Sequence, residues 1–352
     1  MVRAPTIYDV AREAGVAAST VSRAYARPGR VSARTARAIF DAAERIGYRN
    51  DRLDRPGGRD RPVTRAVGLV VADVTNPFYG EIIKGAYEAA RDEGFRLMLS
   101  HTEESPDLER TSIEGDLEAV DALVIASSRM SDSALRTVAK QRAMVLLNRA
   151  IPEVSCLISD NPRGVRRAAE HLGALGHHRI LYVAGPAESW PEGIRWQALR
   201  EAAMELELDV RRIGPNAPTM PAGFRRARRV AESGITAVLA YNDQLAIGVM
   251  KGLRTLGLTV PGDVSVVGFD NIPFGEVVEP GLTTVAAPLR LMGATGVRNC
   301  IAVLRGAHPS APPLVLPVRL VERRSTGPPP GRAGAGAGGA GAVNRSRARR
   351  AR

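Results

Sequence analysis

Four polar side chains lie close together near the start of the chain: Ser19, Thr20, Ser22 and Arg23. Their hydroxyl and guanidinium groups can hydrogen-bond to phosphates and to base edges, and an arginine can pair with guanine through two hydrogen bonds. A helix that turned the intervening Val21 inward would leave these four side chains exposed. The spacing therefore predicts a DNA-facing surface on a short helix.

Three helices would position this surface. Thr6 can cap a first helix, which Gly15 ends, and a second helix is expected over residues 18–26. Ser32 can cap a third helix, which Gly47 ends. The apolar side chains expected to face inward are Ile7, Val10, Ala11, Ala14, Val21, Ala24, Ile39, Ala42, Ala43 and Ile46. Two helices joined by a short turn and braced by a third form a helix-turn-helix, with an ordinary small helical bundle as the alternative.

From Arg65 the sequence changes to short apolar runs that alternate with amphipathic stretches. Such runs are typical of parallel strands that helices cover on both faces. Strands are expected at residues 66–71, 95–99, 122–125 and 143–147 in one α/β unit, and at 156–158, 179–183, 237–240 and 265–269 in a second. The expected fold class is an N-terminal all-α helix-turn-helix domain followed by two doubly wound parallel-sheet subdomains.

A ligand cleft is expected between these two units, because ligands of open parallel sheets bind where strands end and helices begin. The candidate ligand-binding residues on loops after strands are Asn76, Phe78, Asp160, Ser189, Trp190, Arg195, Asn242 and Asp270. Polar groups around a hydroxylated ring, with an aromatic side chain against its apolar face, suit a sugar or nucleoside. Each hydroxyl buried without a partner would cost roughly 1–3 kcal/mol.

Structural roles compete with ligand binding at several of these positions. Asn242 and Asp270 could cap loops, and Asp160 could cap the helix that follows it. Trp190 could pack against a surface helix. Arg195 is the strongest candidate, because a cation on an inward loop beside tryptophan is hard to explain by packing.

The first fifty residues resemble the amino-terminal signature of the lac-repressor (LacI/GalR) family of bacterial regulators. The matching segments are residues 6–16, 20–23, 31–32 with Thr35 and Arg37, and 47–48. The resemblance implies DNA contacts from Thr6, Tyr8, Ala18, Ser19, Thr20, Ser22, Arg23 and Arg30. Ala17 departs from the pattern, because the family usually has a serine there that caps the second helix; losing a cap costs about 1 kcal/mol.

The rest of the chain, to about residue 325, resembles the family's effector domain, which is similar to periplasmic sugar-binding proteins (type I). The matching segments are residues 68–70, 73–79, 120–121, 159–161, 171–172, 175–177, 242–243, 260–270, 280 and 282–285. The resemblance implies a helix-turn-helix domain at 1–49, a hinge at 50–62, and an effector domain at 63–325. Its subdomain one would comprise 63–160 and 287–316, and its subdomain two 161–286 and 317–325. Pro218 stands where relatives often have an aromatic ring.

The hinge is the segment that departs most from the family. Relatives carry a short helix here that orders on the operator and inserts a leucine into the minor groove. Pro56 and Gly57 occupy the corresponding serine and leucine positions, and Leu53 could supply the wedge only in a shifted register. We therefore expect a weakly ordered hinge, with less DNA bending and weaker coupling between effector and operator.

Positive charge is concentrated at the two ends of the chain. The net charge is +7 over residues 1–65 and +8 over 323–352, whereas the whole chain carries +12, so the remaining residues carry −3. This distribution suggests nucleic acid at the head, although a bias towards arginine in the composition also contributes. Residues 326–352 are expected to be a disordered basic tail that either adds non-specific phosphate contacts or has no role.

Other features bound the location and chemistry. No signal peptide and no apolar run of membrane-spanning length is visible. Cys156 and Cys300 are too isolated for a disulfide framework or a metal site. We therefore expect a cytoplasmic protein without a membrane partner or cofactor. Three function classes remain: a regulator, an exported solute-binding protein, and an enzyme. No catalytic motif is present, and His177-His178 is expected to cap a helix C-terminus.

We therefore expect a DNA-binding regulator, and not an enzyme. It would bind a pseudo-palindromic operator as a homodimer and respond to a small, sugar-like effector.

Overall fold

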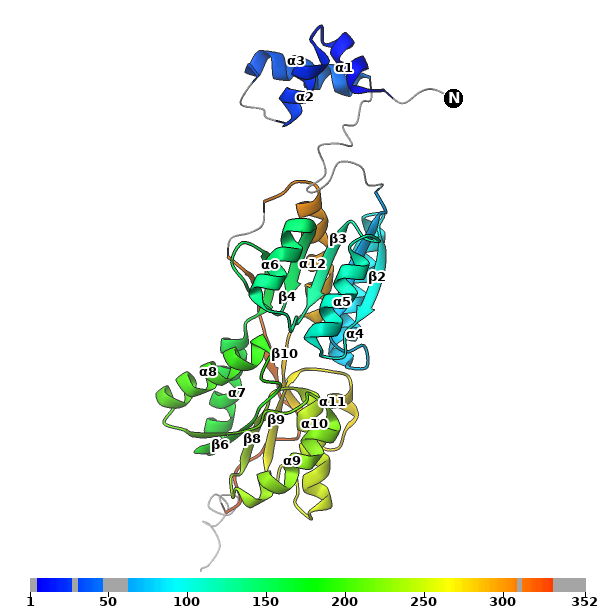
Figure 1. Ribbon diagram of the computed structural model, residues 1–352. Helices are drawn as coiled ribbons and strands as arrows, with labels where there is room; N and C mark the ends of the chain where they lie inside the picture. The colour runs from blue at the N-terminus through cyan, green and yellow to red at the C-terminus, as the bar shows by residue number, and fades with distance from the viewer. Residues whose placement is uncertain (1–4, 27–30, 47–62, 309–311, 332–352) are drawn as a thin grey trace, which may run out of the picture.

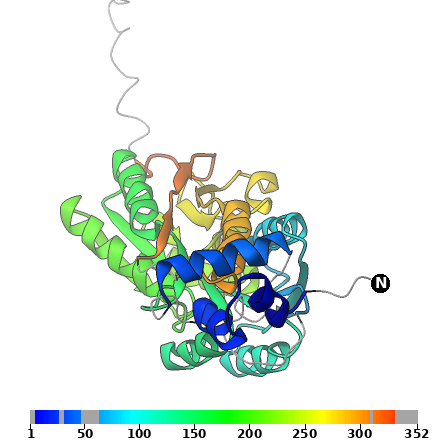
Figure 2. The same ribbon diagram turned by 90° about the horizontal axis from the view of Figure 1, so that it is seen from above.

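The computed structural model describes residues 5–26, 31–46, 63–308 and 312–331. The amino-terminal part, here called the head, contains the three expected helices: α1 (Ile7–Glu13), α2 (Ala18–Ala26) and α3 (Ala33–Arg45). Both views show them gathered into one bundle (Figure 1 and Figure 2). Gly15 follows α1 with a φ of 64°, a left-handed conformation that favours glycine, and so it ends the helix.

The head is held by a small apolar core and by two caps. Val10, Val21 and Ile39 are fully buried at its centre, as the sequence predicts. Thr6 and Asp9 form a capping box at the start of α1, where the Asp9 carboxylate accepts the Thr6 backbone N–H at 2.8 Å. Ser32 caps α3 by accepting the Thr35 N–H at 3.2 Å.

Subdomain one is built on a six-stranded parallel sheet of order β11-β5-β4-β3-β1-β2. Its strands are β1 (Ala66–Val71), β2 (Arg96–His101), β3 (Ala122–Ala126), β4 (Ala143–Leu147), β5 (Ser155–Ser159) and β11 (Leu314–Leu316). Its helices are α4 (Pro77–Asp92), α5 (Pro106–Asp116), α6 (Asp132–Gln141) and α12 (Leu289–Leu304). Alternate residues of the central strands pack on opposite faces, against α4 and α12 on one and against α5 and α6 on the other.

Subdomain two repeats this plan with the sheet order β12-β10-β9-β8-β6-β7. Its strands are β6 (Arg179–Val183), β7 (Asp209–Ile213), β8 (Ala237–Ala240), β9 (Ser265–Asp270), β10 (Thr283–Ala286) and β12 (Arg319–Val321), of which only β12 is antiparallel to its neighbour. Its helices are α7 (Asn161–Ala174), α8 (Trp190–Glu205), α9 (Met220–Glu232), α10 (Asp243–Thr255) and α11 (Phe274–Val277). Figure 1 shows α7 and α8 on one side of this sheet and α9 and α10 on the other.

The chain passes between the two sheets three times, after β5, after β10 and after β11. Three covalent connections at one end of each sheet bring the carboxyl ends of the two sets of parallel strands towards each other. The predicted fold class is confirmed. The loops after these strands are therefore the parts of the body from which a shared site can be built.

Close helix crossings at glycine hold each subdomain together. A Cβ on Gly293 of α12 would lie 2.0 Å from the carbonyl oxygen of Ile82 in α4. In subdomain two, a Cβ on Gly248 of α10 would lie 2.1 Å from the Met220 carbonyl oxygen of α9. Only a residue without a side chain lets the two backbones approach this closely.

Two expectations about the body need correction. Trp190 and Arg195, both expected on a loop, lie in helix α8, which begins at Trp190 because Pro191 in the first turn favours a helix start. The expected tail also begins later than residue 326. His177 contacts the Gly327 carbonyl oxygen at 2.9 Å, and His171 contacts the Thr326 hydroxyl at 2.9 Å.

His177 does not cap the end of α7 with a cationic side chain, as the sequence suggested. Its ring is buried, with Thr236 and Ser265 as hydrogen-bond partners at 2.9 and 3.1 Å. Burial lowers the pKa of this imidazole, so the neutral form is favoured. The residue therefore joins the carboxy-terminal segment to subdomain two.

Candidate DNA-binding surface and ligand cleft

The candidate DNA-binding surface lies on α2. Ser19 and Ser22 are exposed there, Ala18 and Thr20 are half-buried, and the helix is anchored from beneath by fully buried Val21. The helix also carries Arg23, whose side chain is outside the described part of the chain, as are Arg30 and Leu53. Tyr8 on α1 is 69% exposed. A helix that exposes hydroxyl groups and is braced by two others can enter a major groove.

The candidate ligand site is a cleft between the two subdomains. Its lining comes from loops and helix starts that follow strands of both sheets, as expected for this fold. The lining residues are Asn76, Phe78, Tyr79, Glu104, Ser127, Arg129 and Asn148 from subdomain one, and Pro191, Arg195, Pro218, Tyr241, Asn242 and Asp270 from subdomain two. The free volume between them is about 20 Å³, room for about one water molecule, so the two walls are nearly in contact.

The wall from subdomain one contains a buried ion pair. Nε of Arg129 donates to Oε2 of Glu104 at 2.8 Å, and a second guanidinium nitrogen, Nη2, donates to the same oxygen. Nη1 of Arg129 donates to the Ser127 carbonyl oxygen at 3.1 Å. The side chain of Arg129 is 3% exposed, whereas that of Glu104 is 23% exposed. The carboxylate is therefore the partner that a ligand can reach from the cleft.

Arg195 dominates the wall from subdomain two. Nε of Arg195 donates to Oδ1 of Asn161 at 2.8 Å, and Nη1 donates to the Tyr241 carbonyl oxygen. The guanidinium carbon lies 3.6 Å from the centroid of the Phe269 ring, and Nη2 lies 3.7 Å from Oδ1 of Asp270. Stacking and hydrogen bonds together fix this cation in one position. Burial raises the pKa of Asp270 well above its ordinary value, although Arg195 opposes the shift.

Residues just behind the lining hold it in place. Oε2 of Glu109 on α5 accepts the backbone N–H of Arg129 at 2.7 Å, and Glu109 is 2% exposed. The Ser189 hydroxyl lies 2.8 Å from the Tyr241 hydroxyl, which fixes the ring of Tyr241 at the cleft. Both contacts position lining residues rather than a ligand.

Several lining residues have strained backbones. Glu104, Ser127 and Asn148 have φ values of 60°, 57° and 55°, and Asp270 has a φ of 114°. A non-glycine residue in such a conformation costs of order 1–3 kcal/mol, and this strain is typical of functional sites. The fold therefore holds these four residues in conformations that they would otherwise avoid.

Five of the eight sequence-predicted ligand residues come together in the cleft: Asn76, Phe78, Arg195, Asn242 and Asp270. Asn76 and Asn242 are also helix caps, accepting the N–H of the residue two or three positions later at 3.1 and 3.0 Å. The capping alternative therefore holds for Asn242 alongside its cleft position, and Asn76 combines the same two roles. Arg195 lies on helix α8, not on a loop as expected.

The other three predicted residues do not line the cleft. Asp160 accepts the Arg163 N–H at 3.1 Å and so caps α7. Ser189 is buried against Tyr241, behind the lining. Trp190 is half-buried in the first turn of α8. Arg195, about one and a half turns later on the same helix, is the residue that reaches the cleft.

The sequence interpretation missed most of the wall from subdomain one. Glu104, Ser127 and Asn148 follow strands β2, β3 and β4, and Tyr241 follows β8. The rule that a polar residue follows a buried strand would have found Ser127 and Asn148, which come directly after β3 and β4. It would not have found Glu104, which lies three residues past the partly exposed strand β2. Arg129 lies two residues beyond Ser127, so only the structure reveals it.

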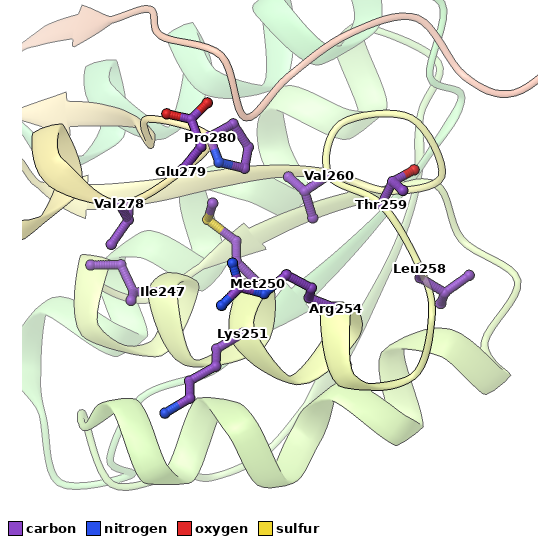
Figure 3. A pocket seen from close by; sticks show the side chains of 10 residues that line it. All are labelled: Ile247, Met250, Lys251, Arg254, Leu258, Thr259, Val260, Val278, Glu279 and Pro280. Carbon is purple, nitrogen blue, oxygen red and sulfur yellow. The ribbon is translucent and has the colours of Figure 1, made fainter.

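A second, larger hollow lies on the outer face of subdomain two (Figure 3). It is a groove of about 350 Å³ between α10 and the segments 258–260 and 278–280, lined mostly by apolar side chains. Figure 3 shows Ile247 and Met250 of α10 facing Val278 and Pro280. Few hydrogen-bonding groups converge there, so the groove suits an apolar protein surface better than a hydroxylated ligand.

Among the residues that the structure describes, no helix is both long and apolar enough to cross a membrane. The same residues contain no cluster of three histidine, cysteine or acidic side chains that could hold a metal ion.

Comparison with known proteins gives matches to both parts of the chain. Residues 6–51 match the model of bacterial regulatory proteins of the lacI family, and residues 169–326 match that of a periplasmic binding protein-like domain. The transcriptional regulator DegA of Bacillus subtilis (strain 168) is 33% identical over 334 residues, which cover 92% of this chain and 98% of DegA.

Solved structures match over nearly the whole chain. A complex of the transcriptional regulator CelR with cellobiose has a TM-score of 0.68 at 29% identity, covering 91% of this chain and 99% of that one. A lac repressor dimer bound to operator and the anti-inducer ONPF has a TM-score of 0.67 at 26% identity, covering 92% and 100%. The likeness extends across head and body together.

Proposed function

The chain belongs to the lacI family of bacterial regulatory proteins, and from this premise we propose that it binds a two-fold symmetric operator as a homodimer under the control of a small effector. It is a DNA-binding transcriptional regulator. The effector would bind in the cleft between subdomains one and two. The relatives are transcriptional regulators, and the proposal assigns no catalytic step to the cleft.

One observation carries the proposal: a helix-turn-helix and a two-walled polar cleft occur in the same chain. A cleft whose walls belong to different subdomains and lie nearly in contact must change shape to admit a ligand. A body that changes shape can alter the spacing of two heads in a dimer, and half-site spacing on DNA is fixed by geometry. Effector binding and operator binding would then be linked.

We propose the apolar groove of Figure 3 as part of the surface that a second copy covers. It is lined by Met250 and Val278, and neighbouring Val277 is 78% exposed. On subdomain one, Tyr87 of α4 and Leu99 of edge strand β2 are 57% and 44% exposed. Large apolar side chains exposed on both subdomains suit a long self-association surface. The lac repressor structure that resembles this chain is a dimer.

The proposed effector is sugar-like. The cleft combines amide, hydroxyl and charged groups with the rings of Phe78 and Tyr241, a set that recognises a hydroxylated ring. CelR, which resembles this chain in structure, holds cellobiose. Operator DNA and sugar metabolites meet in the bacterial cytoplasm, which is the proposed location.

The hinge expected at residues 50–62 lies outside the residues that the structure describes, so the proposal about it rests on its sequence. We propose that Pro56, Gly57 and Gly58 keep it from forming a stable helix, so that this regulator bends its operator less than its relatives do. Operator specificity would then rest more on α2 and on DNA shape.

The test is selection of bound duplexes from a random pool by the purified full-length protein at physiological salt. We expect an inverted repeat with a fixed half-site spacing. Arg23→Ala should weaken the enrichment and relax the preference at the base that it contacts. Arg110→Ala, which removes one positive charge from the surface of α5, should leave the enrichment unchanged. Binding without any enriched motif, which disappears as salt rises, would refute the proposal.

A further inference from the structure

A fully buried carboxyl group lies on the helix that the cleft and the groove of Figure 3 share. Asp243 is 0% exposed and is the first residue of α10, directly after the cleft residue Asn242. Its own side chain is not among the groups that line the cleft. Further along the same helix, Ile247 and Met250 line the groove. Asp243 is therefore close to both surfaces but exposed on neither.

The carboxyl group of Asp243 holds the turn that follows β9. Its Oδ2 accepts the backbone N–H of Ile272 at 2.8 Å, and its Oδ1 lies 2.5 Å from the Thr284 hydroxyl of β10. The same hydroxyl lies 3.4 Å from the backbone nitrogen of Asn271. A buried N–H group that loses its partner is costly. The position of the turn therefore depends on this carboxyl group.

The turn is strained and needs such support. Asp270, the last residue of β9, and Asn271 after it have φ values of 114° and 60°. Non-glycine residues keep these conformations only where their surroundings impose them. Arg323 supplies a second support, because its Nη2 donates to Oδ1 of Asn271 at 2.9 Å. Asp243 and Arg323 together fix the backbone that carries Asp270 into the cleft.

Strand β9 leaves room for the carboxyl group. A Cβ on Gly268 would lie 2.1 Å from Oδ1 of Asp243 and 2.9 Å from Cδ2 of Leu282. Any larger residue at this position would push the carboxyl group away from the turn. Gly268 is therefore matched to Asp243, and a substitution there can displace the carboxyl group without removing it.

The turn continues directly into one wall of the groove. The carbonyl oxygen of Ile272 accepts the N–H of Gly275 in α11 at 3.0 Å. Helix α11 leads to Val278, which lines the groove opposite α10. Ile272 is thus bonded to Asp243 through its N–H and to α11 through its carbonyl group. A shift of the turn would therefore reach the groove.

We propose that Asp243 is a positioning residue that holds the turn 270–272, sets both Asp270 in the cleft and α11 beside the groove, and so couples the cleft to self-association. The inference rests on the proposed function, because it takes the cleft as the effector site and the groove as part of the self-association surface. An effector that shifts Asp270 then alters the affinity of one copy for the other. If Asp243 only favoured the start of α10 through the helix dipole, the turn would not depend on it.

Asparagine should replace this carboxyl group, whereas alanine should not. Burial raises the pKa of Asp243 to about 7, so the contacts must persist in both protonation states near neutral pH. The Thr284 hydroxyl meets this need, because it can donate to an ionised Oδ1 or accept from a protonated one. An asparagine amide can likewise accept the Ile272 N–H and donate to that hydroxyl. Asp243→Asn therefore removes the charge and keeps the hydrogen bonds.

The experiment is sedimentation equilibrium of the full-length protein, which needs no effector. Asp243→Ala should weaken self-association at least about tenfold, whereas Asp243→Asn should stay within about threefold of the wild type. Asp209→Ala, at an exposed position on β7, is the matched control and should behave as the wild type. Hydrogen exchange over residues 270–278 should become faster in Asp243→Ala alone. An Asp243→Ala protein with wild-type self-association would overturn the inference.

A second arm tests the coupling from the side of the cleft. Asp270→Ala removes the contact with Arg195 at the start of the turn and changes no residue of the groove. It should weaken self-association at least about threefold in the wild-type background. In the Asp243→Ala background it should have no further effect, because the turn is already released. Equal effects in the two backgrounds would show that Asp243 does not connect the two surfaces.

Circular dichroism verifies that each variant is folded. Should Asp243→Ala not fold, Gly268→Ala takes its place and should weaken self-association to a similar extent, and a wild-type constant for Gly268→Ala would overturn the inference. A wild-type protein that stays monomeric at every concentration would overturn the self-association surface and this inference with it. Failure of the operator selection would instead overturn the proposed function, and that selection involves no variant of Asp243.

Discussion

On α2, Ser19 and Ser22 are exposed side chains above the buried Val21, whereas in the cleft Arg195 and Asp270 are 6% exposed and are held by neighbouring groups. Head and cleft thus hold their functional residues in opposite ways. We propose that on α2 DNA binding and folding depend on different residues of the same helix. In the cleft, we propose that one set of hydrogen bonds serves both ligand binding and folding. Substitutions should therefore separate DNA binding from stability in the head, but should affect ligand binding and stability together in the cleft.

The largest effect is expected for Arg195→Ala. The substitution removes the partner of Asn161 and of the Tyr241 carbonyl, and it leaves Asp270 buried without a cation. Breaking a buried pair in this way typically costs about 3–5 kcal/mol, so chemical denaturation should show a loss of that order in the free energy of unfolding. The response of operator binding to effector should be lost as well.

Arg200→Ala is the control for this variant, because Arg200 is exposed on the same helix α8. It should change neither property. An Arg195→Ala protein with wild-type stability would contradict the idea that cleft residues serve folding and ligand binding together.

The next largest effect is expected for Arg23→Ala in the head. An arginine that pairs with guanine contributes about 1–3 kcal/mol to operator binding, so affinity should fall roughly 5- to 150-fold. Fluorescence anisotropy with the selected operator measures the affinity, and thermal unfolding measures stability. The unfolding midpoint should not move. A large drop in that midpoint would show that DNA binding and stability cannot be separated in the head.

A smaller effect concerns pH and the carboxy-terminal segment. Burial lowers the pKa of His177, so as the pH falls the unfolded chain takes up a proton before the folded chain does. The contribution of neutral His177 is present above about pH 6.5 and is lost as the pH falls through the folded-state pKa. The loss is of order 1 kcal/mol or less per pH unit.

Denaturation of the wild type and of His177→Gln between pH 7 and pH 5 measures this contribution. The free energy of unfolding should fall more steeply for the wild type, while His178→Gln, at an exposed position, should follow the wild type. Identical slopes for wild type and His177→Gln would show that this histidine does not link protonation to folding.

The smallest effect is expected for Ala17→Ser at the start of α2. Ala17 is exposed and has no side chain to cap the helix, so a serine should stabilise α2 by about 1 kcal/mol or less. Hydrogen exchange of the α2 amides should slow, whereas Ala38→Ser in the middle of α3 should give no protection. Unchanged exchange in α2 would mean that the missing cap is compensated elsewhere.

The same contrast explains what the sequence could predict. The helices of the head follow from local signals, such as Thr6, Gly15 and Ser32 at their ends, and all three are present. Most central strands of both sheets follow from continuous apolar runs, and β1, β4 and β6 match the expected residues. The strands β7, β10, β11 and β12 were missed. The edge strands β7, β11 and β12 are partly exposed, and the buried inner strand β10 is only four residues long and begins with two threonines, so none of the four has such a run.

The cleft was harder to predict because it depends on contacts between distant segments. A polar residue after a strand marked Asn242 and Asp270, but the ion pair of Glu104 with Arg129 joins two loops 25 positions apart. Ser189 has the right position in sequence but contacts Tyr241 behind the lining. Local patterns indicate which loops form a site, whereas the packing of side chains decides which residues reach the ligand.

The central claim is that this chain reads a specific operator through its head. The most direct test compares the affinity of the full-length protein for the selected inverted repeat with that for a scrambled duplex, across a series of salt concentrations. We predict at least about 10³-fold tighter binding to the repeat at physiological salt. Equal affinity for both duplexes, lost in parallel as salt rises, would contradict the account.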